Sequence, residues 1–254
     1  MDPRWDRVER FAGEPLDGTL WIPDYLPHWT TPDRSGARYD FTPGGLELLI
    51  EHDQRAWRPE DGDFRVSHLQ TGEYGGPLGS NVGQHRIGRD LRVVTERPTR
   101  RLWTPPRAGA VEVVASASAD PTCMLGIWLV GHEETSPQDS GEICIAEVFG
   151  DKVTATSSLV RVGIKAHHDP RLVTDLRDVA LPVDATSSHA YGASWDSEGT
   201  AVTFDGVEIY RTDQVLSYPL QLMLDLWEFP HGRREPAAYP KRATLHEVRL
   251  RTDD

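Results

Sequence analysis

Short segments in which hydrophobic and polar residues alternate are the feature that most limits the folds open to this chain. A period of two is typical of β-strands with one buried face, whereas helical periodicity is scarce along the sequence. The segments expected to form strands are residues 45–50, 109–115, 124–130, 142–149, 201–204, 207–210, 220–227 and 245–250. Clusters of Gly, Pro and Asp separate them, so the sequence predicts an all-β fold, an antiparallel β-sandwich or barrel.

The clearest local signal is a hairpin turn at Asp205-Gly206, because alternating segments flank it on both sides. Two other stretches, residues 53–63 and 72–90, are irregular and too long for plain connectors. Long loops often carry binding or catalytic residues on a rigid scaffold. We therefore expect these two stretches to lie over a functional face.

Composition limits the class of partner. The 254 residues include 27 Lys and Arg against 40 Asp and Glu, which gives a net charge of −13. Binding to a polyanion relies on Lys and Arg, so nucleic acid is not an expected partner and neutral ligands are favoured. No linker divides the sequence, which indicates one domain over residues 1–254, with residues 1–15 as a possible N-terminal arm.

The sequence also bears on the compartment. Its N-terminus is charged and offers no apolar run for a signal peptide, and no apolar stretch long enough to cross a membrane follows. A cytoplasmic protein is the default expectation, or an extracellular one if a leader has been removed. The 2 cysteines exclude a disulfide scaffold. The oligomeric state is not predicted.

Residues 142–149, Glu-Ile-Cys-Ile-Ala-Glu-Val-Phe, do not fit a regular strand. Strict alternation would place Glu147 in the apolar layer beside Ile143 and Ile145. Burying an unpaired carboxylate costs several kcal/mol or forces its neutralisation. A β-bulge near Ile145 inserts one residue and returns Glu147 to the face of Glu142. We therefore expect both glutamates to project from one face of a bulged strand.

Two carboxylates on one rigid surface suit glycoside hydrolysis. One can act in its ionised form as the nucleophile, while the other donates a proton as an acid and later acts as a base. In the retaining geometry the carboxyl groups lie ~5–5.5 Å apart, which two Glu side chains on a bent strand could reach. Spacing alone favours a simpler interpretation, a solvated pair of acids on an edge strand.

The order of motifs along the chain adds a second argument. Residues 142–147, Glu-Ile-Cys-Ile-Ala-Glu, resemble the Glu-x-Asp-x-x-Glu signature of glycoside hydrolase family 16 in its bulged, laminarinase-type form. Segments that resemble other strands of this family follow in the same order, at residues 109–113, 124–131, 189–191, 195–196, 204–206, 220–227 and 248–250. The resemblance spans roughly residues 15–252 and implies a jelly-roll sandwich like that of the concanavalin A-like lectins.

The resemblance also implies roles for single residues. Glu142 would be the nucleophile and Glu147 the acid/base, on the concave face of the sandwich. Cys144 would support them in place of the family's Asp, which hydrogen-bonds the nucleophile, and His189 is a second supporting residue. His246 stands where an Asp often helps to bind calcium. We therefore expect no cofactor and no metal site, with structural calcium left open.

Substrate-binding candidates come from the same face of neighbouring strands. Met124 and Trp128 share the expected cleft face, with Met124 where many relatives carry a sugar-stacking Trp. This alternation places Cys123 in the core and Cys144 in the cleft, so both thiols should be free. Asp225, on a late strand, stands where relatives often carry Asn and could hydrogen-bond sugar hydroxyls.

Aromatic side chains can serve as apolar platforms for sugar rings. Packing in the core is an equally good explanation for each Trp. The platform candidates among the 8 Trp are Trp57, Trp103, Trp128 and Trp227. His and acidic residues also cluster at residues 132–134 and 167–169, but their spacing matches no closed set of metal ligands. We interpret both clusters as solvated loop residues.

Together these features predict a retaining, endo-acting glycoside hydrolase that cleaves a neutral, β-linked polysaccharide or oligosaccharide. The alternative from another class is a non-catalytic carbohydrate-binding module, because one fold can host unrelated functions. Cys144 and Met124 favour the module, whereas the two glutamates favour the enzyme. A transglycosylase would share the covalent intermediate and differ only in the acceptor, so the sequence does not separate it from a hydrolase.

Overall fold

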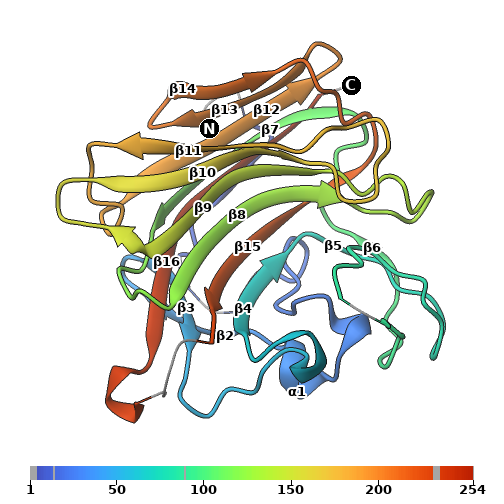
Figure 1. Cartoon of the computed structure of the whole chain (residues 1–254), viewed down its shortest axis with the longest axis horizontal. Helices are drawn as coiled ribbons and strands as arrows, with labels where there is room; N and C mark the ends of the chain where they lie inside the picture. The colour runs from blue at the N-terminus through green and yellow to red at the C-terminus, as the bar shows by residue number, and fades with distance from the viewer. Residues whose placement is uncertain (1–4, 14, 89, 231–234, 254) are drawn as a thin grey trace.

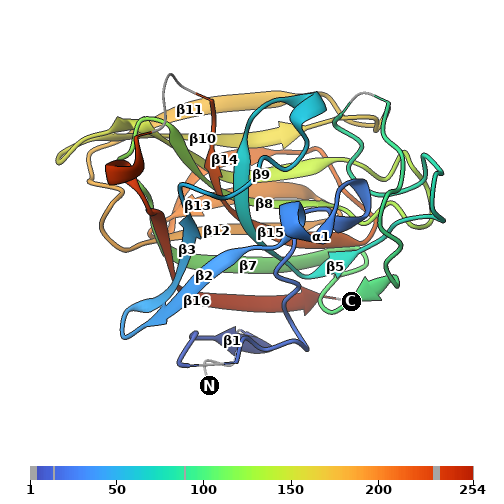
Figure 2. The ribbon, with the colours of Figure 1, turned by 90° about the horizontal axis from the view of Figure 1, so that it is seen from below.

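Two antiparallel β-sheets packed face to face form the body of the molecule (Figure 1, Figure 2). The structure is a computed structural model and describes residues 5–13, 15–88, 90–230 and 235–253. The predicted all-β, jelly-roll sandwich is confirmed. No helix among the described residues is long and apolar enough to cross a membrane.

The two sheets use different strands. The larger has the order β14-β13-β12-β7-β16-β3-β2, with β1 paired to β16. Its strands are β1 (Arg7–Glu9), β2 (Arg38–Thr42), β3 (Gly45–Ile50), β7 (Ala108–Ser116), β12 (His189–Asp196), β13 (Gly199–Phe204), β14 (Val207–Thr212) and β16 (Lys241–Asp253). The six-stranded sheet has the order β11-β10-β9-β8-β15-β4. Its strands are β4 (Arg65–Gln70), β8 (Cys123–Gly131), β9 (Glu142–Val153), β10 (Ser158–Lys165), β11 (Asp175–Leu181) and β15 (Leu220–Glu228).

Short elements complete the described chain. A two-stranded sheet joins β5 (Gly72–Glu73) and β6 (Arg100–Arg101). The helical turns are η1 (Pro27–Trp29), α1 (Pro32–Ser35), η2 (Pro59–Asp61) and η3 (Pro236–Ala238).

The core between the sheets follows from the alternation that the sequence predicts. Every second residue of β8 and β15 points inward, and a fully buried aliphatic side chain contributes about 1.5–3 kcal/mol. The inward residues of these two strands are Cys123, Leu125, Ile127, Leu129, Leu220, Leu222, Leu224 and Leu226. Residues between them, such as Trp128 and Trp227, lie on the outer face in a second apolar cluster.

The register of β9 contains the predicted bulge. Its neighbour β8 pairs Ile127 with Ala146 but Trp128 with Cys144, which leaves Ile145 as the extra residue. Ile145 and Ala146 both belong to the core between the sheets. As a result, the two glutamates of this strand share its outer face, as the sequence predicts.

Two other predictions concern the larger sheet. The hairpin is confirmed, because β13 and β14 are joined by Asp205 and Gly206, which have φ angles of 48° and 77°. Part of the expected N-terminal arm is a strand, since β1 pairs with Val248, Arg249 and Leu250 of β16 and lies below that strand in Figure 2. Residues 1–4 and 14 of that arm lie outside the described residues.

Candidate active site

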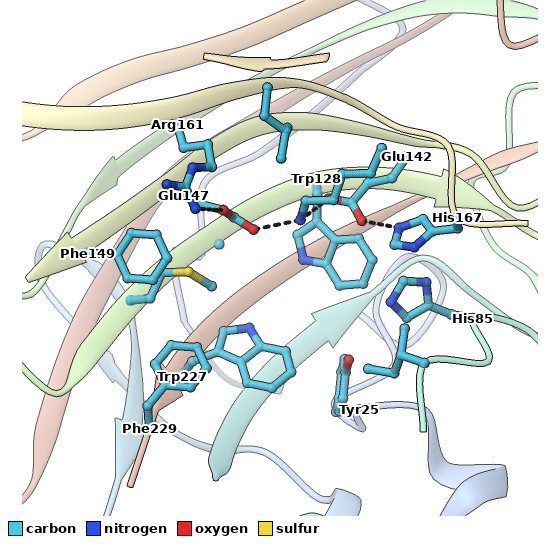
Figure 3. Close-up of a pocket in the computed structure, with 15 residues that line it drawn as sticks. Tyr25, His85, Trp128, Glu142, Glu147, Phe149, Arg161, His167, Trp227 and Phe229 are labelled. Atoms are coloured by element: carbon cyan, nitrogen blue, oxygen red, sulfur yellow. Dashed lines mark hydrogen bonds and ion pairs between the residues drawn. The ribbon is translucent and has the colours of Figure 1, made fainter. Parts of the chain in front are cut away.

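A cavity of about 380 Å³ lies on the outer face of the six-stranded sheet (Figure 3). The irregular stretch 72–90 contributes His85 and Ile87 to its wall, whereas residues 53–63 do not line it. The lining residues are Tyr25, His85, Ile87, Met124, Gly126, Trp128, Glu142, Glu147, Phe149, Arg161, Lys165, His167, Leu176, Trp227 and Phe229.

Glu142 and Glu147 project from β9 into this cavity (Figure 3). A carboxylate oxygen of Glu142 lies within 4.8 Å of one of Glu147. The side chain of Glu142 is 4% exposed and that of Glu147 is 15% exposed. One carboxylate of the pair is therefore shielded, while the other is more accessible to solvent.

Lys165 lies between the two carboxylates. Its Nζ atom is 2.8 Å from Oε1 of Glu142 and 2.6 Å from Oε1 of Glu147. The register explains this position, since Lys165 pairs with Glu142, and Arg161 with Glu147, across β9 and β10. Arg161 also donates two hydrogen bonds to Asp178 on β11. The sequence pattern identifies neither cation, because neither belongs to the strand that carries the two glutamates.

The charges around Glu142 keep it ionised. Burial raises the pKa of this carboxyl, but Lys165 and His167 outweigh burial and hold the pKa at about 2. Burial lowers the pKa of Lys165, but the facing carboxylates, Glu142 foremost, raise it above its usual value. Near neutral pH, Glu142 is therefore an anion and Lys165 a cation.

Cys144 stands between the glutamates in the sequence, yet its thiol bonds to the backbone. The Sγ atom lies 3.4 Å from the carbonyl oxygen of Arg161, to which the thiol donates. Burial raises the pKa of Cys144 well above its usual value, so the thiol stays protonated. Cys123 lies in the core between the sheets, and both thiols are free, as predicted.

His167 belongs to the site, although the sequence predicts solvated loop residues at 167–169. Its Nε2 atom lies 2.7 Å from Oε2 of Glu142. Asp169 is buried and accepts a hydrogen bond from Tyr218. The solvated interpretation is therefore wrong for Asp169, whereas His167 and His168 are exposed. The period of two that continues from Lys165 to His167 is the signal that could have identified this histidine.

The cluster at residues 132–134 is also largely buried rather than solvated. His132 is 2% exposed and Glu133 is 4% exposed. A carboxylate oxygen of Glu133 accepts a hydrogen bond from the backbone N–H of His85. The ring of His85 packs against those of Trp128 and His167, with both centroid distances at 4.9 Å. The structure thus adds His85 to the candidate site.

Aromatic side chains form one wall of the cavity. Of the predicted substrate-binding residues, Met124, Trp128 and Trp227 line it. Trp227 stacks on Phe229 with centroids 5.9 Å apart and an interplanar angle of 6°, and Phe149 stacks on Phe229 at 6.3 Å. Neither Phe residue is among the sequence-based predictions, although each follows a predicted site residue by two positions, the period of a strand.

Two predicted platforms do not reach the cavity. Trp57 is 0% exposed, and its Nε1 donates a hydrogen bond to the carbonyl oxygen of Tyr25. Trp103 packs edge-on against Trp195, which belongs to the core between the sheets. The platform prediction is wrong for both residues, because loops and the core cover their faces.

Asp225 lies beneath the cavity instead of pointing into it. Its side chain is 0% exposed, and the carboxylate accepts a hydrogen bond from Nε1 of Trp128 and pairs with Nδ1 of His68. The prediction that Asp225 binds sugar hydroxyls is therefore wrong. Because Asp225 holds a ring that lines the cavity, it acts here as a positioning residue.

Two further histidines lie away from the cavity. His189, on β12, places Nδ1 2.8 Å from Oδ2 of Asp205 and Nε2 3.1 Å from the carbonyl oxygen of Asp184, so it supports a turn in the other sheet. His246 places Nδ1 2.5 Å from the carbonyl oxygen of Gly44. Calcium prefers oxygen ligands, so the imidazole of His246 is not a suitable ligand for the calcium ion found in the family that the sequence resembles.

Two groups among the described residues bring three potential metal-ligand atoms within 4.8 Å of one another. Their members are His85, Glu142 and His167 in one group, and Glu142, Cys144 and Glu147 in the other. In the second group, the ammonium of Lys165 lies between the two carboxylates and supplies the positive charge that a metal ion would bring there.

Comparison with known proteins gives a fold but no sequence match. No family model and no curated protein matches the sequence. The endo-β-galactosidase from Clostridium perfringens that releases GlcNAcα1-4Gal is similar in structure, with a TM-score of 0.82 and 22% identity over 98% of this chain. The match covers 62% of that structure, so this chain spans less than two thirds of its length.

Two glucanases are also similar in structure. The catalytic domain of an endo-1,3-β-glucanase (laminarinase) from Thermotoga petrophila RKU-1 matches with a TM-score of 0.66 and 14% identity, over 98% of each chain. A non-specific endo-β-1,3(4)-glucanase from family GH16, co-crystallised with glucan oligosaccharide, matches with a TM-score of 0.63 and 14% identity, over 98% of this chain and 94% of that one. The chain therefore has the β-sandwich fold of glycoside hydrolase family 16.

Proposed function

We propose that this protein is a retaining glycoside hydrolase that cleaves β-linked polysaccharides or oligosaccharides internally. The observation that carries this proposal is the closeness of Glu142 and Glu147, whose carboxylate oxygens lie within 4.8 Å on one bulged strand. Retaining enzymes hold their carboxyl groups ~5–5.5 Å apart, whereas inverting enzymes leave ~6.5–9.5 Å for a water molecule. The short separation favours the retaining mechanism.

In the first step, the ionised carboxylate of Glu142 attacks the anomeric carbon. The glycosidic C–O bond breaks, its electron pair stays on the glycosidic oxygen, and that oxygen takes a proton from Glu147. This step requires Glu147 in its protonated form, and 15% of its side chain is exposed to solvent. The products are a glycosyl ester on Glu142 and a released sugar chain.

In the second step, water attacks the anomeric carbon while Glu147 accepts a proton from it. The ester bond breaks, Glu142 leaves as a carboxylate, and Glu147 is protonated again. Lys165 stays protonated and stabilises the departing carboxylate of Glu142. A sugar hydroxyl in place of water would give transglycosylation with the same residues.

The cavity walls favour an uncharged sugar at the point of cleavage. The stacked rings of Trp227 and Phe229 offer an apolar surface, and Arg161 and Lys165 are paired with carboxylates of the protein. The similar structures include, by name, an endo-β-galactosidase and endo-β-glucanases. Neutral β-galactans and β-glucans are therefore the first substrates to test.

Mass spectrometry of the products from a panel of these polysaccharides tests the proposal. The wild-type protein should release oligosaccharides, and Glu142→Gln should release none. Glu198→Gln, at an exposed turn of the larger sheet, is the matched control and should keep wild-type activity. Full activity of Glu142→Gln would refute the assignment. Binding without any product across a range of pH would favour the carbohydrate-binding module.

Chemical rescue with azide separates the two roles. In Glu142→Ala, azide can attack an activated aryl glycoside from the vacated side and give a glycosyl azide of inverted configuration. In Glu147→Ala, azide attacks the glycosyl ester on Glu142 and gives the retained configuration. Nuclear magnetic resonance of the anomeric proton distinguishes the products, and the reverse pattern would exchange the roles of the two residues.

A further inference from the structure

His85, Glu142 and His167 meet at one end of the cavity (Figure 3). One potential ligand atom of each lies within 4.8 Å of the other two. The three residues come from separate parts of the chain, namely the loop before β6, the start of β9 and the loop after β10. Folding therefore brings two imidazoles and one carboxylate to one point.

We propose that this group binds a transition-metal dication of the zinc type, which neutralises Glu142. Two imidazoles and one carboxylate are a ligand set that zinc accepts, with a fourth position left to water. Calcium and magnesium prefer sets made of oxygen atoms, so they should bind weakly here. This inference departs from the sequence-based expectation of no metal site.

The carboxylate of Glu142 can serve a metal ion and Lys165 together. Lys165 lies 2.8 Å from Oε1 of Glu142, whereas Nε2 of His167 lies 2.7 Å from the other oxygen, Oε2. An ion on the Oε2 side would replace the hydrogen bond to His167 with two metal–ligand bonds. Ligands ~2.0–2.1 Å from zinc lie roughly 3.3 Å apart in a tetrahedron, so this pair needs to separate only slightly.

His85 supplies the third ligand from a ring that packing holds in place. Among the described residues, no hydrogen bond joins its ring nitrogens to protein atoms. Its ring rests on those of Trp128 and His167, and Glu133 holds its backbone N–H. The nitrogens of His85 are therefore available to a ligand without the loss of another contact.

Zinc binding and catalysis should respond in opposite directions to the charge on Lys165. Its ammonium repels a metal ion on the far side of the Glu142 carboxylate, so Lys165→Met should bind zinc more tightly. The same change should weaken catalysis, because Glu142 loses its cationic partner. Damage to the fold of the site would instead weaken both.

Titration calorimetry with Zn²⁺, and absorption spectra with Co²⁺, test the metal site on the whole protein. We expect one ion per wild-type chain. His85→Phe keeps an aromatic ring against Trp128 but removes the ligand nitrogen. Its zinc affinity should fall at least about tenfold, because the loss of a residue that only hydrogen-bonds a metal ligand already lowers metal affinity by about that factor. His52→Phe, which keeps a ring against Tyr239 on the surface, should bind as the wild type does.

Equal zinc affinity in the wild type and His85→Phe, or the absence of a stoichiometric Co²⁺ spectrum, would overturn the inference. Binding is measured without substrate, so a protein that binds zinc through His85 but cleaves no polysaccharide would refute only the proposed hydrolysis. If the proposed hydrolysis is correct, zinc bound to Glu142 should inhibit it. This inhibition should be competitive with the polysaccharide substrate, because both need the Glu142 carboxylate. Non-competitive inhibition would also count against this site.

Discussion

The Nζ atom of Lys165 lies 2.8 Å from Oε1 of Glu142, the residue directly opposite it on the neighbouring strand. In the family that the sequence resembles, an Asp two residues after the nucleophile hydrogen-bonds it, but Cys144 stands at this position. A cation across the strands keeps Glu142 ionised without that Asp. The departure from the motif therefore does not by itself argue against catalysis.

Replacing Lys165 should shift the acid limb of the pH–activity profile. In Lys165→Met the burial of Glu142 is no longer offset by this ammonium, so the pKa of Glu142 rises from about 2. The proposed nucleophile must be ionised, and the acid limb should therefore move to higher pH. We also expect kcat to fall roughly a hundredfold, as for other lost electrostatic partners. Rates measured across pH in buffer with EDTA check both effects.

Lys152→Met is the control for this experiment, because Lys152 pairs with Asp151 at the exposed end of β9. Its profile should match that of the wild type. An unchanged acid limb in Lys165→Met would show that Lys165 does not set the ionisation of Glu142.

The bulged strand could be predicted because its evidence is local. A regular strand would bury Glu147, and one inserted residue removes that cost. Lys165 could not be found in this way. Its position opposite Glu142 depends on the register between β9 and β10, and that register itself shifts between Arg161 and Gly163. Partners across strands are long-range information that the pattern of one strand does not hold.

The wrong predictions have a different physical cause. Alternation correctly placed Asp225 on the outer face of the six-stranded sheet, but it does not tell which parts of that face remain open. Residues of the preceding loops, including Tyr25 and Trp29, cover part of it in a second apolar cluster. Trp57 joins that cluster, so a residue expected to meet sugar instead packs beneath the cavity wall.

Glu133 should make stability depend on pH. Burial raises the pKa of Glu133 to about 8, from an ordinary value of 4.5. The folded state therefore binds this proton more tightly, and its contribution to stability is lost as pH rises from 4.5 through 8. Glu133→Gln does not titrate, so it should gain stability over the wild type across this window. The gain is a few kcal/mol, at about 1.4 kcal/mol per pKa unit.

Urea unfolding at pH 5 and pH 8 measures this difference in the free energy of unfolding. Glu134→Gln is the control, because its carboxylate is 31% exposed and pairs with Arg101. A difference between Glu133→Gln and the wild type that stays constant with pH would contradict the prediction.

Asp225 should affect substrate binding through Trp128. Asn at this position is uncharged and offers one acceptor oxygen and one donor NH2, so Trp128 and His68 no longer both face a carboxylate oxygen. We expect the free energy of unfolding to fall by about 1–3 kcal/mol and KM to rise more than kcat falls. Kinetics and thermal unfolding of Asp225→Asn test this, with Asp40→Asn on the exposed part of β2 as the control. An unchanged KM in Asp225→Asn would show that Asp225 does not position Trp128 for substrate binding.

Gly163 is a position in the six-stranded sheet, beside the site, that tolerates no side chain. Its φ angle is 137°, and a Cβ atom there would lie 2.0 Å from the carbonyl oxygen of Asp175. Gly163→Ala should therefore lower the free energy of unfolding by at least about 1–3 kcal/mol, the usual cost of one strained residue. Gly18→Ala has open space around its Cβ and should change little. Gly163 pairs with Cys144 on β9. Equal stability of the two variants would therefore mean that β10 can move away from β11 without disturbing β9.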